Sequence, residues 1–84
     1  MAKRVIFSAE ARADIRAIDR QTALRLLKAL ARFLGTGAGN GKQLEGYDPL
    51  RYRLRVGAWR YIFLKSGEDA IEVIQVCNRR EAYR

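Results

Sequence analysis

The segment from Leu50 to Tyr61 gathers the side chains that could do chemistry. It reads L-R-Y-R-L-R-V-G-A-W-R-Y, with apolar and basic residues in strict alternation over its first half. In a β-strand this alternation sends Arg51, Arg53 and Arg55 to one face and the apolar side chains to the other. Guanidinium groups bind phosphates through paired hydrogen bonds. The arginine face therefore predicts an anion site, and a phosphodiester backbone is the anion that fits best.

A tight turn adds a fourth arginine to this face. Gly57-Ala58 predicts a two-residue hairpin loop of type II′, because that turn needs glycine at its first central position. Such a loop places Arg60 opposite Arg55, on the same face. Opposed like charges destabilise a sheet by roughly a few tenths of a kcal/mol per pair. This favours a bound anion, although a charged face that only prevents aggregation is the alternative.

The rest of the chain must supply the elements that position this surface. Periodic apolar residues with capping residues predict two helices, and alternating or β-branched runs predict strands. The glycine-rich residues 36–41 are interpreted as a flexible connector, because the Gly-Lys-Ser/Thr ending of a phosphate-binding loop is missing. In chain order the predicted elements are a strand over Lys3–Phe7, helices over Ala9–Ile18 and from Arg20 to Gly35, an extended segment over Lys42–Gly46, and strands over Leu50–Val56, Trp59–Leu64 and Ala70–Asn78.

This order predicts an α+β fold in a single domain over residues 1–84. Helices that precede an antiparallel sheet pack on one of its faces. We therefore expect an N-terminal strand, a two-helix hairpin and an antiparallel sheet of three to four strands with the helices on one face. Tyr47, in a loop, fits either packing or contact with a partner. The covered face should carry Leu50, Tyr52, Leu54, Val56, Trp59, Tyr61 and Phe63, and the open face the four arginines with Ile62 and Leu64.

The composition limits the classes of function. Seventeen Lys and Arg against nine Asp and Glu give the 84 residues a net charge of +8, which suggests a nucleic acid, a ribonucleoprotein or an acidic protein as partner. Histidine is absent, so the usual proton shuttle and the commonest metal ligand are missing. We expect no metal and no cofactor. The lone Cys77 cannot form an internal disulfide, and no signal peptide or membrane span is recognisable, which predicts a cytoplasmic protein without a membrane partner.

The ordered set of segments resembles the RelE family of bacterial and archaeal toxins, within the wider RelE/ParE superfamily. The segments are K-Q-L-E-G at 42–46, R-Y-R-L-R-V-G-A-W-R-Y at 51–61 and I-E-V-I-Q-V-C-N-R-R-E-A-Y-R at 71–84. The resemblance implies an mRNA interferase, an endoribonuclease that enters the ribosomal A site and cleaves the messenger. It also implies a co-encoded antitoxin that wraps the toxin, with DNA contacted only indirectly through that antitoxin.

The resemblance also assigns roles to individual residues. Metal-independent cleavage uses the 2′-hydroxyl as nucleophile, and the charge that develops on the phosphorane needs fixed cations. Tyr83 would orient or deprotonate the hydroxyl, or stack on a base. Asn78 stands where family members often carry His or Lys, so the nuclease would be slow, inactive or completed by the ribosome. The expected catalytic residues are Arg60, Arg79 and Tyr83, and the expected RNA-binding residues are Arg51, Arg53, Arg55, Lys42 and Arg80.

Two alternatives share the same fold. One is a gyrase-inhibiting toxin of the ParE type, which would trap a DNA–gyrase complex instead of cleaving messengers. The other is an inactivated toxin that only partners its antitoxin in a DNA-bound complex. Such a protein would bind the antitoxin and show no toxicity when induced.

Overall fold

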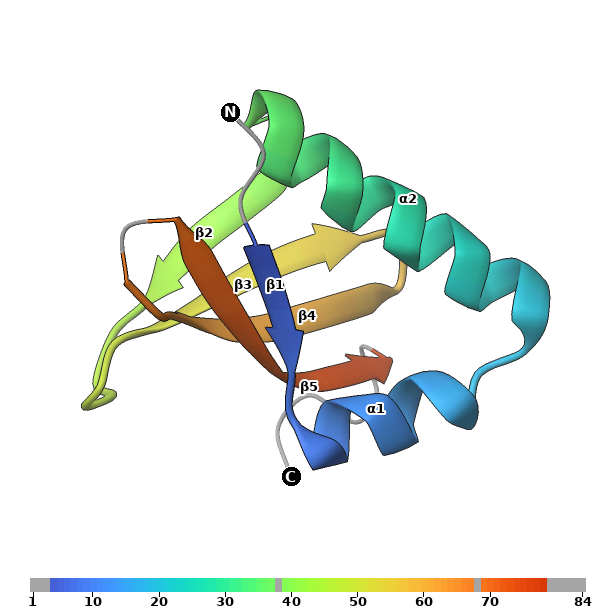
Figure 1. Cartoon of the computed structure of the whole chain (residues 1–84), viewed down its shortest axis with the longest axis horizontal. Coiled ribbons are helices and arrows are strands. Elements are labelled where there is room, and N and C mark those ends of the chain that lie inside the picture. The colour runs from blue at the N-terminus through green and yellow to red at the C-terminus, as the bar shows by residue number, and fades with distance from the viewer. Residues whose placement is uncertain (1–3, 38, 68, 79–84) are drawn as a thin grey trace.

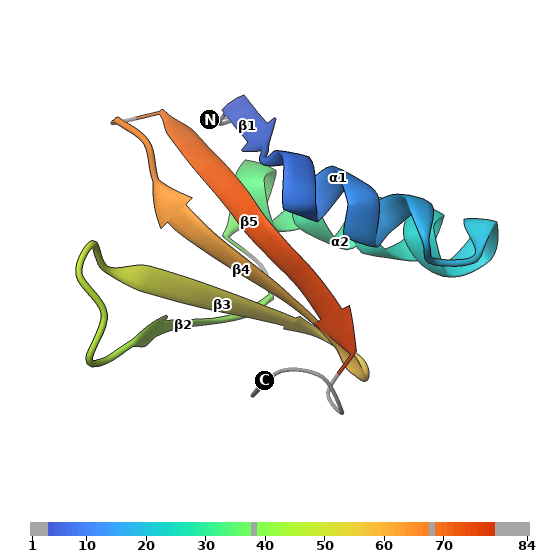
Figure 2. The same cartoon turned by 90° about the horizontal axis from the view of Figure 1, so that it is seen from below.

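The computed structural model describes residues 4–37, 39–67 and 69–78, and these residues form two helices and five strands. Both helices lie on one face of a single sheet with the strand order β1-β5-β4-β3-β2 (Figure 1, Figure 2). The predicted α+β architecture, with a helical hairpin covering one face, is confirmed. The elements are β1 (Arg4–Phe7), α1 (Ala9–Arg16), α2 (Arg20–Thr36), β2 (Asn40–Leu44), β3 (Arg51–Val56), β4 (Trp59–Lys65) and β5 (Ala70–Asn78).

Strand β1 makes the sheet mixed rather than purely antiparallel. It pairs in parallel with β5, Arg4 opposite Ala70 and Phe7 opposite Val73, whereas the other neighbouring strands run antiparallel. A parallel pair needs a long crossover connection. Here the connection contains both helices and strands β2, β3 and β4. Because β1 and β5 are so far apart in the chain, local sequence patterns could not predict that they pair or in which direction.

Beyond the point where β1 ends, helix α1 covers the edge of β5. The Ser8 hydroxyl accepts a hydrogen bond from the Ala11 N–H as N-cap and donates to the Ile74 carbonyl at 3.4 Å. The Asp14 carboxylate accepts the Val76 N–H at 3.0 Å. Backbone groups of a sheet edge need partners when they are buried. Helix α1 therefore supplies side-chain partners where the parallel pairing stops.

Each helix begins after an N-cap residue, Ser8 for α1 and Asp19 for α2. The Asp19 carboxylate accepts the Thr22 N–H at 3.0 Å, and this hydrogen bond lowers the pKa of the Asp19 carboxyl. Helix α2 ends at Gly37, which has φ +75°, a conformation that glycine adopts without strain. Helix α1 is two residues shorter than predicted and α2 one residue longer. No helix in the described ranges is both long and apolar enough to cross a membrane.

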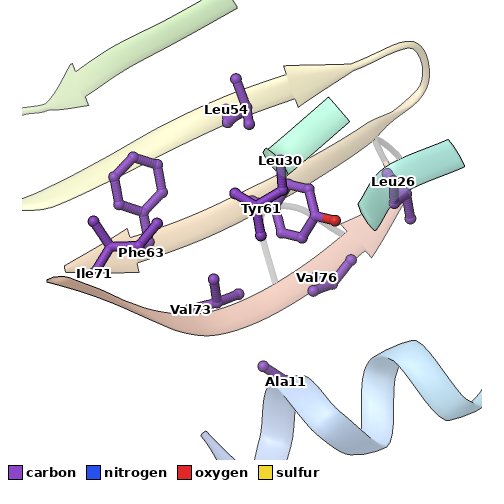
Figure 3. Close-up of a cluster of buried hydrophobic side chains, with 9 residues drawn as sticks. All are labelled: Ala11, Leu26, Leu30, Leu54, Tyr61, Phe63, Ile71, Val73 and Val76. Atoms are coloured by element: carbon purple, nitrogen blue, oxygen red, sulfur yellow. The ribbon is translucent and has the colours of Figure 1, made fainter. Parts of the chain in front are cut away.

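The core lies between the helices and the covered face of the sheet. Six of the seven side chains predicted for that face belong to the core or pack against it. Leu50 is the exception and is 49% exposed, because β3 begins only at Arg51. The buried cluster in Figure 3 consists of Ala11, Leu26, Leu30, Leu54, Tyr61, Phe63, Ile71, Val73 and Val76.

The β3–β4 hairpin has the predicted register. Gly57 has φ +59°, no described non-glycine residue has a positive φ, and Arg55 pairs with Arg60. Strand β2 differs from the prediction, since it begins at Asn40 and includes Gly41. The end of the glycine-rich segment is therefore strand rather than connector.

Candidate nucleic-acid interface

The four arginines of the β3–β4 hairpin lie on the face of the sheet opposite the helices, and Figure 2 shows this face turned away from α1 and α2. They are Arg51, Arg53, Arg55 and Arg60. Cross-strand partners share a face. Arg55 is opposite Arg60, and Lys42 of β2 is opposite Arg53. Three neighbouring strands therefore contribute cations to this face.

Arg51, Arg53 and Arg60 line one cavity of about 150 Å³, called here the arginine cavity. A water molecule needs only about 10–15 Å³ of such space, so the cavity has room for a phosphate group. Three of the predicted cations thus converge on one small volume. The cavity is also lined by Leu44, Glu45, Tyr47, Ile62 and Gln75.

Arg60 is the most enclosed of these cations. Only 7% of its surface is exposed, and its neighbour on the same face, Ile62, is 9% exposed. The face predicted to be open is therefore partly enclosed, because the loop after β2 brings Glu45 and Tyr47 to the same cavity. Charges attract more strongly where water is excluded. A phosphate beside Arg60 would be held more tightly than one on a flat exposed surface.

Arg53 brings an unsatisfied donor to the cavity. Its Nε is buried and has no hydrogen-bond partner within the described residues. Leaving a buried donor unpaired costs about 1–3 kcal/mol. A phosphate oxygen in the arginine cavity is the kind of acceptor that would satisfy it.

Tyr47, for which the sequence predicted either packing or contact with a partner, packs against Arg51. The Arg51 guanidinium carbon lies 4.7 Å from the centre of the Tyr47 ring, so the ring helps to position this cation. The side chain is nevertheless 46% exposed, which leaves ring surface available for stacking. Sequence reasoning did not select Glu45 or Gln75. The signal for Glu45 was that residues 42–46 could pair antiparallel with the strand that carries Arg51 and Arg53. Such pairing brings Glu45 close to Arg51.

The other predicted site residues do not join the arginine cavity. Arg55 instead lines a separate groove of about 530 Å³ together with residues of α2. Lys42 is exposed and does not line the cavity. Arg79, Arg80 and Tyr83 lie outside the described residues, so of the three predicted catalytic residues the structure places only Arg60.

Asn78, which stands where related toxins often carry His or Lys, does not share a face with the arginines. Asn78 is opposite Trp59, which packs against the core on the helix side. Because cross-strand partners share a face, Asn78 is on the helix side and not on the arginine face. Cys77, a buried free thiol, is the β5 residue opposite Arg60.

Comparison with protein families gives the class. Residues 5–83 match the family model described as ParE toxin of type II toxin–antitoxin system, parDE. The chain belongs to this family and is a type II toxin of the RelE/ParE superfamily. A search of curated proteins found no significant match.

Solved structures of toxin–antitoxin complexes share the fold. The RelBE2 complex from Mycobacterium tuberculosis matches with a TM-score of 0.77 and 18% identity, over 94% of this chain and 100% of that chain. The RelE–RelB complex from Pyrococcus horikoshii OT3 gives 0.74 and 20%, over 98% and 100%. The RelB–RelE complex from Methanococcus jannaschii gives 0.73 and 21%, over 93% and 94%. At these identities the likeness establishes the fold alone.

Proposed function

We propose that this toxin is a metal-independent endoribonuclease that cleaves messenger RNA on the ribosome, and that a cognate antitoxin neutralises it. The observation that supports this most is the convergence of Arg51, Arg53 and Arg60 on one phosphate-sized cavity. Because the proposed substrate is messenger RNA on the ribosome, the proposed place of action is the cytoplasm.

The cavity suits cleavage by the RNA's own 2′-hydroxyl. The O2′ atom loses its proton and attacks the adjacent phosphorus while the bond from phosphorus to O5′ breaks. O5′ takes a proton from solvent water, and the products are a 2′,3′-cyclic phosphate and a 5′-hydroxyl. Negative charge grows on the non-bridging oxygens in between, and preorganised cations stabilise it most where water is excluded. Arg60 is the enclosed cation that we assign to this role, with Arg51 and Arg53 holding the phosphate.

Proton transfer has two candidates. Glu45 is the acidic side chain among the residues that line the arginine cavity, and a carboxylate can accept the O2′ proton. Tyr83, proposed from the sequence for the same step, lies outside the described residues. Arg79 is proposed as a second stabilising cation. Lys42, Arg55 and Arg80 are proposed to hold the RNA backbone beyond the scissile phosphate.

The test replaces Arg60 by Lys, which keeps the charge and removes the two-pronged hydrogen bonding. Loss of one such donor typically lowers the rate of the chemical step by about 100-fold or more. We expect that cells induced to make Arg60→Lys continue to grow. We also expect that their messengers lack the breaks that are mapped as new 5′ ends within the ribosomal A site. The control is Arg12→Lys, an exposed residue of α1, which should stay toxic. Thermal unfolding of both variants separates loss of chemistry from loss of fold. If folded Arg60→Lys cleaves as well as the parent, Arg60 does not have this role.

Gyrase inhibition is the second candidate, and the description of the matching family favours it. The same induction distinguishes the two functions. Trapped DNA–gyrase complexes without messenger breaks would replace the nuclease proposal. An absence of both, with antitoxin binding retained, would identify an inactivated toxin.

A further inference from the structure

Tyr47 lies at the rim of the arginine cavity, in the loop of residues 45–50 that joins β2 to β3. Leu44 pairs with Arg51, so this loop is anchored at both ends beside the cavity. The Arg51 guanidinium lies over the Tyr47 ring, 4.7 Å from its centre, and the Tyr47 side chain is 46% exposed. Arg51 therefore holds one face of the ring, and much of the side chain stays open to a ligand.

The volume of the arginine cavity limits what can enter it. At about 150 Å³ the cavity is smaller than ordinary small-molecule sites, which have about 300–1,000 Å³. It has room for a phosphate, and the buried Nε of Arg53 is a donor without a partner among the described residues. A nucleobase joined to that phosphate through its sugar must therefore lie outside the cavity, at the rim.

We propose that Tyr47 is a stacking platform for the nucleobase next to the phosphate in the arginine cavity. This inference rests on the proposed function, which supplies RNA as the ligand. Every base has a flat π face, so an aromatic ring binds bases with little dependence on sequence. An arginine on the other face of the ring adds a cation–π contribution. The arginines hold the charge of the strand, and Tyr47 holds its base.

An acidic protein segment is the competing occupant of this surface. Such a segment would need an aromatic or apolar side chain beside a carboxylate, at the spacing that the loop requires. A nucleic acid carries an anion and a flat ring at a fixed spacing in every repeat. The cations also come from two strands, Arg51 and Arg53 from β3 and Arg60 from β4. A tetrahedral phosphate directs its oxygens out of a single plane, whereas a carboxylate has two oxygens in one plane. Both features favour a nucleotide.

The test compares two strands of equal length that cannot be cleaved by 2′-hydroxyl attack. One is 2′-O-methyl oligoadenylate, and the other is a 2′-O-methyl strand that lacks every base. The quantity measured is the ratio of their binding constants, because the two backbones carry the same number of phosphates and the salt-dependent contribution cancels.

Tyr47→Ala removes the ring and Tyr47→Phe keeps it. Leu50→Ala is the matched control, because Leu50 belongs to the same loop and is 49% exposed but does not line the cavity. We expect Tyr47→Ala to lower the parent's ratio by about 5-fold to 150-fold, the effect of losing one stacked base. Tyr47→Phe and Leu50→Ala should keep the parent's ratio.

Other outcomes would overturn the proposal. Equal losses on both strands in Tyr47→Ala would show that Tyr47 only positions Arg51. A loss confined to antitoxin affinity would identify a protein segment as the occupant. A parent that binds the two strands equally, or binds neither, would leave no base to stack. Failure of the nuclease proposal has a different result, since a missing chemical step removes the messenger breaks in cells and leaves the ratio of binding constants unchanged.

Discussion

Adjacent residues of β4 have opposite surroundings. Arg60 faces the arginine cavity, whereas Tyr61 points into the core with 0% of its surface exposed. The Tyr61 hydroxyl is buried and has no hydrogen-bond partner within the described residues. Burial also raises the pKa of this phenol. The core therefore contains a hydroxyl oxygen that no hydrogen bond within the described residues stabilises.

Replacing Tyr61 by Phe should leave stability unchanged or raise it by about 1 kcal/mol, because it removes an unsatisfied buried hydroxyl. The parent should also lose stability as the pH rises above about 10, the ordinary pKa of tyrosine. The folded-state pKa is raised, so stability from the protonated phenol is complete below that pH and is lost above it. Tyr61→Phe should lack this part of the decline.

Urea unfolding at neutral and alkaline pH measures both effects. Tyr47→Phe is the control, since Tyr47 is 46% exposed and its replacement should keep the alkaline decline. A clear loss of stability in Tyr61→Phe at neutral pH would mean that the hydroxyl has a partner.

The sequence predicted which face each arginine would occupy, because strand alternation is local. It did not predict that Arg55 would line a groove together with residues of α2 and would not line the arginine cavity. That division depends on the path of α2 over the sheet and on where β2 begins. Both are set by tertiary packing. Glu45 was missed for the same reason, since the loop after β2 brings it to the cavity.

At the scale of elements, Gly41 sets how closely β2 approaches α2. A Cβ atom on Gly41 would lie 2.9 Å from the Phe33 ring, closer than such contacts allow. Phe33 in turn packs edge-on against Phe63, with ring centres 6.0 Å apart. The glycine that the sequence suggested was part of a connector is therefore a packing requirement.

Gly41→Ala should destabilise the fold by about 1–3 kcal/mol, the usual effect of overpacking a core. Gly35→Ala is the control, because its Cβ would meet nothing within 4 Å and it lies inside α2. Alanine is preferred over glycine in a helix by about 0.5–1 kcal/mol, so the control should be more stable than the parent. Chemical denaturation of both variants gives the comparison, and equal effects would refute the packing role of Gly41.

Strand and helix positions were largely predictable. The last strand was predicted over Ala70–Asn78 and is observed there, because a long β-branched run bounded by a turn is a strong local signal. The short Arg4–Phe7 strand was also located, but its partner was not. Pairing direction depends on contacts between segments far apart in the chain.

At the scale of the whole molecule, Asp14 joins the first part of the chain to the last. Its hydrogen bond to the Val76 N–H spans 62 positions in sequence and lies beyond the point where β1 stops pairing with β5. Asp14→Ala should lower the free energy of unfolding by about 1.5–3 kcal/mol, because a charged acceptor is lost and a backbone donor is left unpaired.

Asp14→Asn provides the comparison, since its amide oxygen can still accept the Val76 N–H. We expect a smaller loss than in Asp14→Ala, and faster exchange of the Val76 amide hydrogen in the alanine variant alone. Equal destabilisation by both variants would show that the carboxylate acts through its charge rather than through this hydrogen bond.

The place of β5 in the sheet has a consequence for synthesis of the toxin. This strand lies between β1 and β4, although the ribosome makes it after both. A growing chain that stops before Ala70 leaves β1 with no neighbour, and the β2–β4 segment loses the strand that pairs along its other edge. Such a chain can form the β2–β3–β4 part of the sheet but has nothing to join it to β1. The five-stranded sheet behind the arginine cavity is therefore complete only once β5 has been made.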